Sequence, residues 1–293
     1  MTKKVWTDEE KEELTKKSKF RMEQAEELLV KGIEEVFSSE KYADFLKFYS
    51  GFHQYSLTNM LLIMIQFPEA SCCASYADWK KKGRHVKKGE KGLMIRVPTP
   101  KKFIVEDEDG NEEERFKLFF KVGSVFDISQ TDGEPLPEIC NKLTGIVENY
   151  SEIYDSICAA AGIPVTLEDF EGSANGFYSP TESKIVIRSG MSEAQTIKTL
   201  VHETAHSLLH KKGGEQEKVD RETAELQAES VAYIVCNYLG IDTSDYSFGY
   251  VAGWSKGKSS KHLEKNLTII GKAAEKIIAR LEGKPETEGK AAA

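Results

Sequence analysis

The 293-residue sequence has no apolar run long enough to span a bilayer, and Met1-Thr2-Lys3-Lys4 leads into a charged segment without the apolar core of a secretion signal. Its five cysteines are an odd, scattered set without the paired spacing of a cysteine metal site. These absences argue against a membrane-spanning protein and a disulfide-rich secreted domain. We expect a cytoplasmic protein with reduced thiols and no membrane partner.

A general excess of basic residues is also missing, because the formal net charge is -8 at pH 7. This argues against a uniformly basic nucleic-acid binder. With 40% hydrophobic and 30% charged residues, the composition suits two folded domains. Between Trp79 and Lys102, however, ten lysines or arginines accompany a single acid, Glu90. This local excess predicts a cationic surface on an otherwise acidic protein.

Two histidines stand four positions apart in the segment His202-Glu203-Thr204-Ala205-His206. Residues at this spacing share one face of a helix, so both rings can approach one cation while Glu203 points toward a water bound to it. Zinc in such a site acidifies its water, and Glu203 would be the catalytic general base. The pattern predicts a catalytic zinc site. A packed or solvated histidine pair is the alternative.

A catalytic zinc site needs a third protein ligand, and we place it at Glu225. Glu225 belongs to a second helical pattern over residues 221–235. One turn later, Glu229 would be an outer acceptor for the free ring nitrogen of a ligating histidine. Glu222 shares the Glu225 face and is the rival ligand, and a solvated acidic face is the alternative for Glu225 and Glu229. His210 is interpreted as a packing or outer residue.

Local signals place the histidine pair on a helix. Ser192 and Gln195 form a capping-box pattern, and Gly213-Gly214 would end the helix. Upstream, the strand-like runs 176–179 and 184–188 predict a hairpin, whose edge could align an extended peptide by main-chain hydrogen bonds. A hairpin that merely covers the helices is the alternative.

Residues from about 146 to 239 resemble a zincin metallopeptidase domain of the ImmA/IrrE kind. The resemblance rests on the histidine-glutamate motif, a glutamate on the next helix and the preceding strand pair. It implies zinc ligands at His202, His206 and Glu225, a catalytic base at Glu203, and a peptide or protein substrate. Because some relatives act chiefly as sensors or binders, a site without peptidase activity is the alternative.

Aromatic residues crowd the approach to the basic segment. Single-stranded nucleic acid is bound by cations that follow its phosphates and by flat rings that stack on unpaired bases. The candidates for stacking are Tyr49, Phe52, Tyr55 and Trp79, and the candidates for phosphate contact are Lys81, Arg84, Lys87, Lys88 and Lys91. Because aromatic side chains commonly fill cores, a structural role is the alternative for these rings.

Helices are predicted over residues 7–49 from their periodic apolar positions. Asp109-Gly110 predicts the tip of a hairpin between strands 103–105 and 116–120. The glycines among residues 83–92 lack the context of a nucleotide loop. They predict the turns of a basic hairpin ahead of a strand at 93–97.

Several ordered motifs between residues 10 and 131 resemble the N-terminal domain of ArdC-type antirestriction proteins. These motifs are Tyr55-Ser56 to Asn59, Gln66-Phe67-Pro68, Ala77 to Trp79, Gly83 to Gly92, and Val125 to Thr131. The resemblance implies a single-stranded-DNA-binding domain in a protein of a mobile element that protects entering DNA from restriction.

The turn-rich residues 132–137 mark the expected domain boundary. We predict an α+β protein with a helical and β-hairpin DNA-binding domain over 1–131, a mainly helical zincin-like domain with a small sheet and a C-terminal helix over 138–282, and a disordered tail over 283–293. The predicted function is antirestriction by a single-stranded-DNA-binding protein with a zinc metallopeptidase-like domain. The alternatives are a non-catalytic DNA-binding protein with a structural or vestigial zinc site, and a repressor-processing metallopeptidase.

Overall fold

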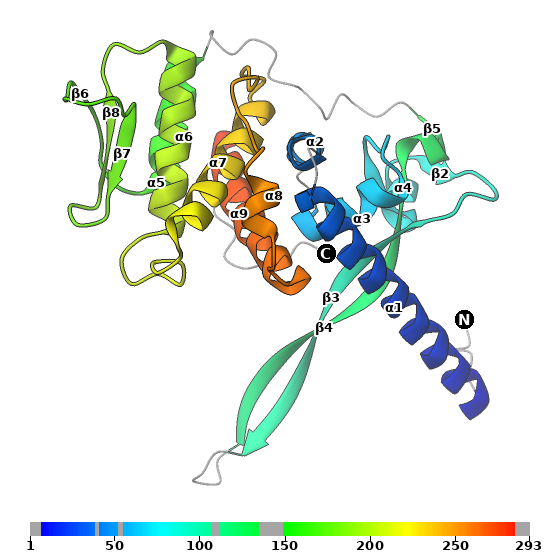
Figure 1. Cartoon of the computed structure of the whole chain (residues 1–293). Helices are drawn as coiled ribbons and strands as arrows, with labels where there is room; N and C mark the ends of the chain where they lie inside the picture. The colour runs from blue at the N-terminus through cyan, green and yellow to red at the C-terminus, as the bar shows by residue number, and fades with distance from the viewer. Residues whose placement is uncertain (1–6, 39–40, 52–54, 107–111, 135–148, 285–293) are drawn as a thin grey trace. The chain divides into compact units, whose positions relative to one another are not determined.

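A computed structural model describes residues 7–38, 41–51, 55–106, 112–134 and 149–284 of the chain (Figure 1). The chain forms two compact units. The first comprises chiefly Met1–Gly32 and Asn59–Pro135, and the second comprises Ile33–Thr58 and Leu136–Lys290. Residues 33–58 therefore belong with the C-terminal half of the chain. A division along the sequence at residues 131–138 would place them in the first domain.

The first unit contains a three-stranded antiparallel sheet in the order β1 (Cys73–Ser75), β4 (Glu112–Asp127) and β3 (Leu93–Glu106). A separate antiparallel pair joins β2 (Arg84–Val86) to β5 (Thr131–Gly133). Its helical parts are α1 (Asp8–Ser38) up to Gly32, α3 (Leu57–Gln66) from Asn59, α4 (Tyr76–Lys81) and a 3-10 turn at Ile128–Gln130.

Two side-chain amides of α3 cover the outer edge of β3. Asn59 Nδ2 donates to the carbonyl oxygen of Arg96 at 2.9 Å, and Asn59 Oδ1 accepts from Arg96 N at 2.8 Å. Gln66 makes the same pair of bonds with Met94, at 3.0 Å and 2.8 Å. An open strand edge exposes unpaired backbone groups, and these amides satisfy them as a further strand would. These hydrogen bonds give a physical reason why side-chain amides stand at positions 59 and 66 of the two motifs.

The β3–β4 hairpin is longer than the sequence pattern predicts. Its register runs from Leu93 opposite Val125 to Glu106 opposite Glu112, so the predicted strands 93–97 and 103–105 are one continuous strand. Because β1 pairs with only the last three residues of β4, the rest of the hairpin is a two-stranded ribbon (Figure 1). The prediction of a separate basic hairpin before Leu93 is wrong, because β2 pairs with β5 instead.

The second unit is built around α7 (Arg221–Tyr238), which contacts α2 (Lys41–Ser50), α6 (Glu193–Leu209), α8 (Val251–Ser255) and α9 (Ser260–Leu281). The helix α5 (Tyr150–Ala161) packs on α6 and α9. Val231, Ile234 and Val235 of α7 are fully buried. The apolar pattern of this segment therefore marks a core helix, as predicted. From α2, Tyr42 Oη is hydrogen-bonded to Ser230 Oγ at 2.8 Å, which attaches residues 33–58 to this core.

A small sheet lies against α6 in the order β6 (Val165–Glu168), β8 (Lys184–Arg188) and β7 (Gly176–Ser179). β6 is parallel to β8, and β7 is antiparallel to it, which confirms the predicted hairpin. β7 is an edge strand of this sheet. A Cβ atom on Gly176 would lie 2.8 Å from Thr199 Cγ2 and 2.9 Å from the carbonyl oxygen of Val186, so glycine permits the strand to pack closely on α6.

These elements confirm the predicted α+β class, with helices and β-hairpins in the first half and a mainly helical second half with a small sheet. Within the described ranges, no helix combines the length and apolarity needed to cross a bilayer. Cys158 and Cys236 carry thiols and not disulfides, as predicted, while Cys140 lies outside the described residues.

Candidate metal centre

The helix α6 begins at the predicted capping residue, because Ser192 Oγ accepts a hydrogen bond from Gln195 N at 3.3 Å. It ends at Leu209, four residues before the predicted stop, with His210 as its C-cap. Leu200, Val201 and Ala205 are fully buried on the core side of the helix. The burial of this apolar side fixes the rotation of α6 and directs the histidine pair toward α7.

His202, His206 and Glu225 converge on one point. His202 Nε2 lies 3.1 Å from His206 Nε2, and Glu225 Oε2 lies 3.5 Å and 3.7 Å from these two atoms. A tetrahedral zinc with ligand distances of ~2.0–2.1 Å separates its ligand atoms by ~3.3–3.4 Å. The three donors therefore fit one such ion. They form the one group of three or more histidine, cysteine or acidic side chains in the described part of the chain that could hold a metal.

The position of Glu225 follows from the start of α7. Asp220 caps this helix, accepting a hydrogen bond from Thr223 N at 2.9 Å. The structure brings Glu225 to the histidines, whereas the rival Glu222, one turn earlier, is exposed and is not part of the metal-binding group.

The electrostatics of this cluster suit a cation. The side chains of His202, first, and of His206 lie beside the carboxylate of Glu225 and hold its pKa well below its usual range. Burial lowers the pKa of His202, but its hydrogen bond to Glu225 and the charge of Glu203 outweigh burial and raise it. The site thus holds imidazoles and carboxylates at close range, and a divalent ion could bind both kinds of group.

Glu203 lies beside this cluster and is buried. Its burial raises the pKa of the carboxyl group, and the two neighbouring histidines only partly offset that rise. The backbone of Tyr178 in β7 also interacts with this carboxylate. The carboxylate that the sequence suggests as a general base therefore lies next to the candidate metal ligands and the edge strand.

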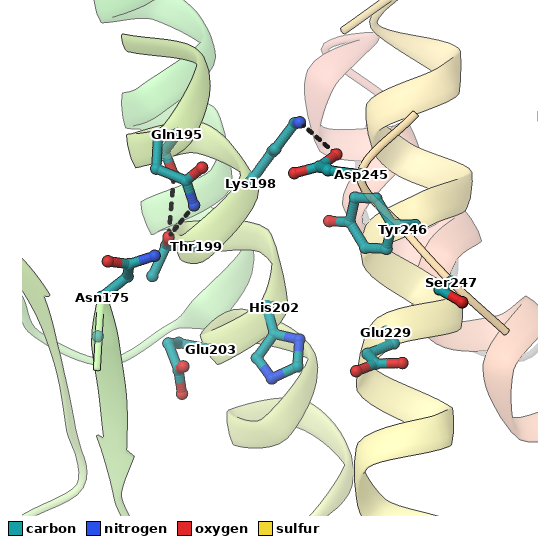
Figure 2. A pocket seen from close by; sticks show the side chains of 11 residues that line it. Asn175, Gln195, Lys198, Thr199, His202, Glu203, Glu229, Asp245, Tyr246 and Ser247 are labelled. Carbon is teal, nitrogen blue, oxygen red and sulfur yellow. Dashed lines mark hydrogen bonds and ion pairs between the residues drawn. The ribbon is translucent and has the colours of Figure 1, made fainter. Parts of the chain in front are cut away.

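A pocket of about 290 Å³ opens beside His202 and Glu203 (Figure 2). It is lined by Asn175, Gly176, Gln195, Lys198, Thr199, His202, Glu203, Glu229, Asp245, Tyr246 and Ser247. Figure 2 shows His202 and Glu203 projecting from α6, with Glu229 on α7 across from them. Lys198 Nζ pairs with Asp245 Oδ1 at 2.7 Å on the pocket wall. The combination of a concave site with the histidine cluster identifies a candidate substrate pocket.

The hydrogen bonds of the histidine rings on the side away from the candidate metal position differ from the prediction for Glu229. Glu229 accepts a hydrogen bond from Tyr250 Oη at 2.6 Å, and no hydrogen bond joins it to a histidine ring in the described residues. The outer neighbour is instead His210, whose Nδ1 lies 2.9 Å from His206 Nδ1. His210 Nε2 in turn lies 2.9 Å from Gln227 Oε1. The sequence suggests His210 through its helical spacing, but no signal distinguishes Gln227.

The prediction that Tyr49, Tyr55 and Trp79 stack on bases is wrong, because all three side chains are buried. Tyr49 and Trp79 are 0% exposed, and Tyr55 is also buried. Tyr49 Oη donates to Glu275 Oε1 at 2.8 Å, and Trp79 Nε1 donates to the carbonyl oxygen of Phe126 at 2.8 Å. A ring without an accessible face cannot stack on a base, so these three residues are core residues. Phe52 lies outside the described residues.

The predicted phosphate contacts fall into two groups. Arg84 is half-buried and donates to the carbonyl oxygens of Thr131 and Gly133 at 3.0 Å and 3.3 Å, so it joins β2 to β5. The lysines at 81, 87, 88 and 91 are exposed. Lys81 pairs with Asp78 at 2.8 Å, and Lys87 Nζ donates to the carbonyl oxygen of Ser129 at 2.9 Å. An exposed cationic segment at 87–91 is therefore present.

Two family models match the chain, one in each half. Residues 8–126 match the family described as the N-terminal domain of anti-restriction factor ArdC, and residues 158–238 match the IrrE N-terminal-like domain of peptidase family M78. The chain joins an ArdC-type domain to an IrrE-like domain. This confirms the predicted fusion.

Solved structures share the fold. The crystal structure of the antirestriction ArdC protein from plasmid R388 in its metal-free form has a TM-score of 0.57 and 23% identity, covering 88% of this chain and 99% of that chain. The Mn(II)-bound form has a TM-score of 0.55 and 23% identity, covering 86% and 97%. An uncharacterized protein of Bacillus anthracis is 28% identical over 326 residues and 97% of this chain. The chain spans about half of that relative, 54% of its length.

Proposed function

We propose that the protein is a cytoplasmic antirestriction factor that binds single-stranded DNA through its ArdC-type domain and carries a zinc-dependent peptidase site in its IrrE-like domain. The observation that carries the peptidase part is the convergence of His202, His206 and Glu225 beside the buried carboxylate of Glu203. The ArdC-type domain and the exposed lysines of residues 87–91 support the DNA-binding part.

The donor set favours zinc. Two imidazole nitrogens and one carboxylate oxygen make up the ligands of one class of catalytic zinc site, which keeps its last position for water or substrate. Imidazole also suits several other divalent ions, so the protein's surroundings and metal supply influence which ion is bound. The ArdC protein of plasmid R388 has been crystallised with Mn(II) bound, which makes manganese the rival ion for this site.

Zinc at this site would supply Lewis acidity for a water molecule and for the scissile carbonyl. The chain's own part of the reaction lies with Glu203. Because burial raises its pKa, this carboxylate is a better proton acceptor than an exposed glutamate. It would take the proton of the attacking water and deliver it to the leaving amine. Because Glu203 is buried, little bulk water reaches this carboxylate.

The substrate would be an extended peptide. Asn175 and Gly176 line the pocket at the start of the edge strand β7. A strand at a sheet edge can pair with an added peptide through its backbone groups, which selects for extended chains before side chains are recognised. Held along β7, a peptide bond would lie close to Glu203, because Tyr178 of the same strand interacts with that carboxylate.

Two measurements on the purified full chain test the proposal. Metal analysis should find about one zinc per chain, with loss of the metal from a His206→Ala variant. Titration with fluorescent oligonucleotides should give tighter binding to single strands than to duplexes. A chain that takes up no divalent ion would remove the peptidase part. Equal or absent binding of the two DNA forms would remove the single-strand part.

A further inference from the structure

The stem of the β3–β4 hairpin exposes aromatic and cationic side chains. Antiparallel partners lie on one face of a ribbon, and alternate residues lie on opposite faces. The register places Lys101 opposite Lys117, Thr99 opposite Phe119, and Val97 opposite Lys121. By the same alternation, Phe103 falls on this face, which we name the lysine face. The other face carries Pro98, Pro100, Lys102, Phe116, Leu118 and Phe120, and we name it the apolar face.

The lysine face presents two phenylalanine rings next to each other. Phe103 is 41% exposed and Phe119 is 37% exposed, and their ring centroids lie 6.0 Å apart. Lys101 Nζ and Lys117 Nζ lie 5.0 Å and 5.7 Å from the centroid of Phe119. Each ammonium group is therefore within range of a cation–π interaction with this ring. The exposed lysines and the two rings alternate across a small area of the stem.

This placement is costly for a purely structural element. A two-stranded ribbon has no core of its own, and its exposed rings lose the stabilisation that burial would provide. A binding partner that covers the rings would recover it. The charge of the stem indicates the kind of partner. Residues 93–105 and 115–126 contain six lysines or arginines and no acid.

We propose that the lysine face is a stacking surface for the unpaired bases of a single-stranded nucleic acid, an inference that rests on the DNA binding proposed above and locates it. Phe103 and Phe119 would each support one base, and Lys101, Lys117 and Lys121 would contact the flanking phosphates. A single-stranded nucleic acid matches this face, because its phosphates can pair with the lysines and its flat bases can stack on the phenylalanine rings. A duplex does not, because its base faces are already stacked on one another.

The strand would cross the stem and would not run to the tip of the hairpin. Seven acidic residues lie between 106 and 114 in the sequence, and they repel phosphates. The basic stem and the acidic sequence beyond it therefore set an outer limit to the binding surface. On its inner side, the surface ends where Ile95 and Val125 are buried.

The apolar face provides a matched control. Phe116 is 71% exposed on that face, more than either ring of the lysine face, and its replacement removes a similar side chain from the same ribbon. A general effect of weakening the hairpin should follow from either replacement. A loss of base stacking should follow only from changes on the lysine face.

The experiment measures the binding of the full chain to three oligomers: oligo-dT, an abasic oligomer of equal length, and oligo-U. The abasic oligomer separates base stacking from phosphate contact. Phe103→Ala with Phe119→Ala should weaken oligo-dT binding roughly 5-fold or more for each ring and leave binding to the abasic oligomer unchanged. Phe119→Tyr should retain the affinity of the wild type, and Phe116→Ala should match the wild type on all three oligomers. The oligo-U arm tests whether RNA is preferred to DNA.

Each other result has a distinct meaning. A wild-type protein that binds no single strand removes the proposed function and this surface together. A wild type that binds, with the double variant unchanged on oligo-dT, overturns the surface alone and leaves the face to a protein partner. An equal loss in Phe116→Ala overturns the choice of face, and tighter binding to oligo-U overturns DNA as the occupant.

Discussion

The Nδ1 atom of His206 lies 2.9 Å from the Nδ1 atom of His210, one helical turn later. One of the two atoms must carry the hydrogen. Because His210 Nε2 lies 2.9 Å from the acceptor Gln227 Oε1, that nitrogen carries the hydrogen of a neutral His210. Burial lowers the pKa of His210, which favours the neutral ring. His206 then donates through Nδ1, and its Nε2 keeps a lone pair for a metal.

The donor and acceptor roles in this series of hydrogen bonds are fixed by its last member, the backbone carbonyl of His262. Gln227 Nε2 donates to Asn266 Oδ1 at 2.7 Å, and Asn266 Nδ2 donates to the carbonyl oxygen of His262 at 3.0 Å. A backbone carbonyl can only accept, so every amide and ring along the series has a defined orientation. The series therefore sets the tautomer in which His206 can act as a ligand.

Replacement of His210 by Ala should weaken metal binding roughly 10- to 100-fold, because His206 would lose the partner that fixes its ring. Competition with a chelator of known affinity measures this change. The exposed neighbour Lys211 offers a control, since Lys211→Ala should bind metal as the wild type does. Unchanged affinity in the His210 variant would show that the tautomer of His206 is set in another way.

Replacement of Glu203 by Gln should retain the metal and lower peptide hydrolysis by about 10²-fold or more, because an amide cannot accept the proton of the attacking water. Metal analysis and cleavage of a generic peptide library measure the two effects separately. Hydrolysis at the wild-type rate would remove Glu203 from the reaction. A conjugation assay with the same variant then determines whether antirestriction depends on catalysis or on binding alone.

The third ligand is tested by two glutamates one turn apart. Glu225→Ala should lose the metal, because it removes the oxygen 3.5 Å from His202 Nε2. Glu222→Ala should keep it, since Glu222 is exposed and lies outside the cluster. Both variants remove one carboxylate from the same helix, so a difference in bound zinc reports the ligand and not the net charge. Retention of zinc by the Glu225 variant would contradict the assignment.

Replacement of Lys87, Lys88 and Lys91 together by Ala should weaken single-strand binding and flatten its dependence on salt, by roughly 0.7 in the logarithmic slope for each lost phosphate contact. Fluorescence titrations at several salt concentrations measure the slope. A triple replacement of the lysines at 16, 17 and 19 removes the same charge from α1, where acidic neighbours accompany each lysine. Equal effects of the two triple variants would point to net charge and not to a local surface.

The convergence of the candidate metal ligands could be predicted from the sequence because its determinants are local. His202 and His206 are one turn apart, and the apolar positions of α6 and α7 fix the faces of the two helices. The contacts of Glu229 and Gln227 are harder to predict from the sequence. The partner of Glu229, Tyr250, lies 21 residues away, and the partner of Gln227, Asn266, lies 39 residues away. Sequence spacing does not determine such contacts.

The aromatic residues of the first half show the same limit. Composition identified rings near cations, but only tertiary packing decides which rings retain an accessible face. Trp79 is fully buried, whereas Phe119 stays exposed because, among the described residues, no third strand pairs with this part of the ribbon. The mixture of Phe and Lys over residues 116–121 is visible in the sequence. Its meaning depends on the length of the hairpin, which the pattern underestimated.

In the first unit, the side chain of Asp127 holds the turn after β4 and contributes to stability. Burial raises the pKa of its carboxyl group, but hydrogen bonds from the backbone N–H groups of Cys72, Ser129 and Ser71 outweigh burial, and the pKa is lowered overall. The distances from Ser71 N and Cys72 N to Oδ2 are 2.7 Å and 2.9 Å. The ionised carboxylate therefore stabilises the fold above the unfolded-state pKa of about 3.9, and this stabilisation is lost as the pH falls through the lower folded-state pKa.

Asp127→Asn should lower the free energy of unfolding by about 1–3 kcal/mol at pH 7, because an amide offers one acceptor oxygen in place of two. The difference from the wild type should shrink below about pH 4, where the carboxyl group takes up a proton in the unfolded chain. Urea denaturation followed by tryptophan fluorescence, at pH 7 and at pH 3, measures both values. Asp132→Asn changes an exposed carboxylate of β5 and should alter stability by less than about 0.5 kcal/mol. A difference independent of pH would assign the loss to the geometry of the hydrogen bonds and not to the charge.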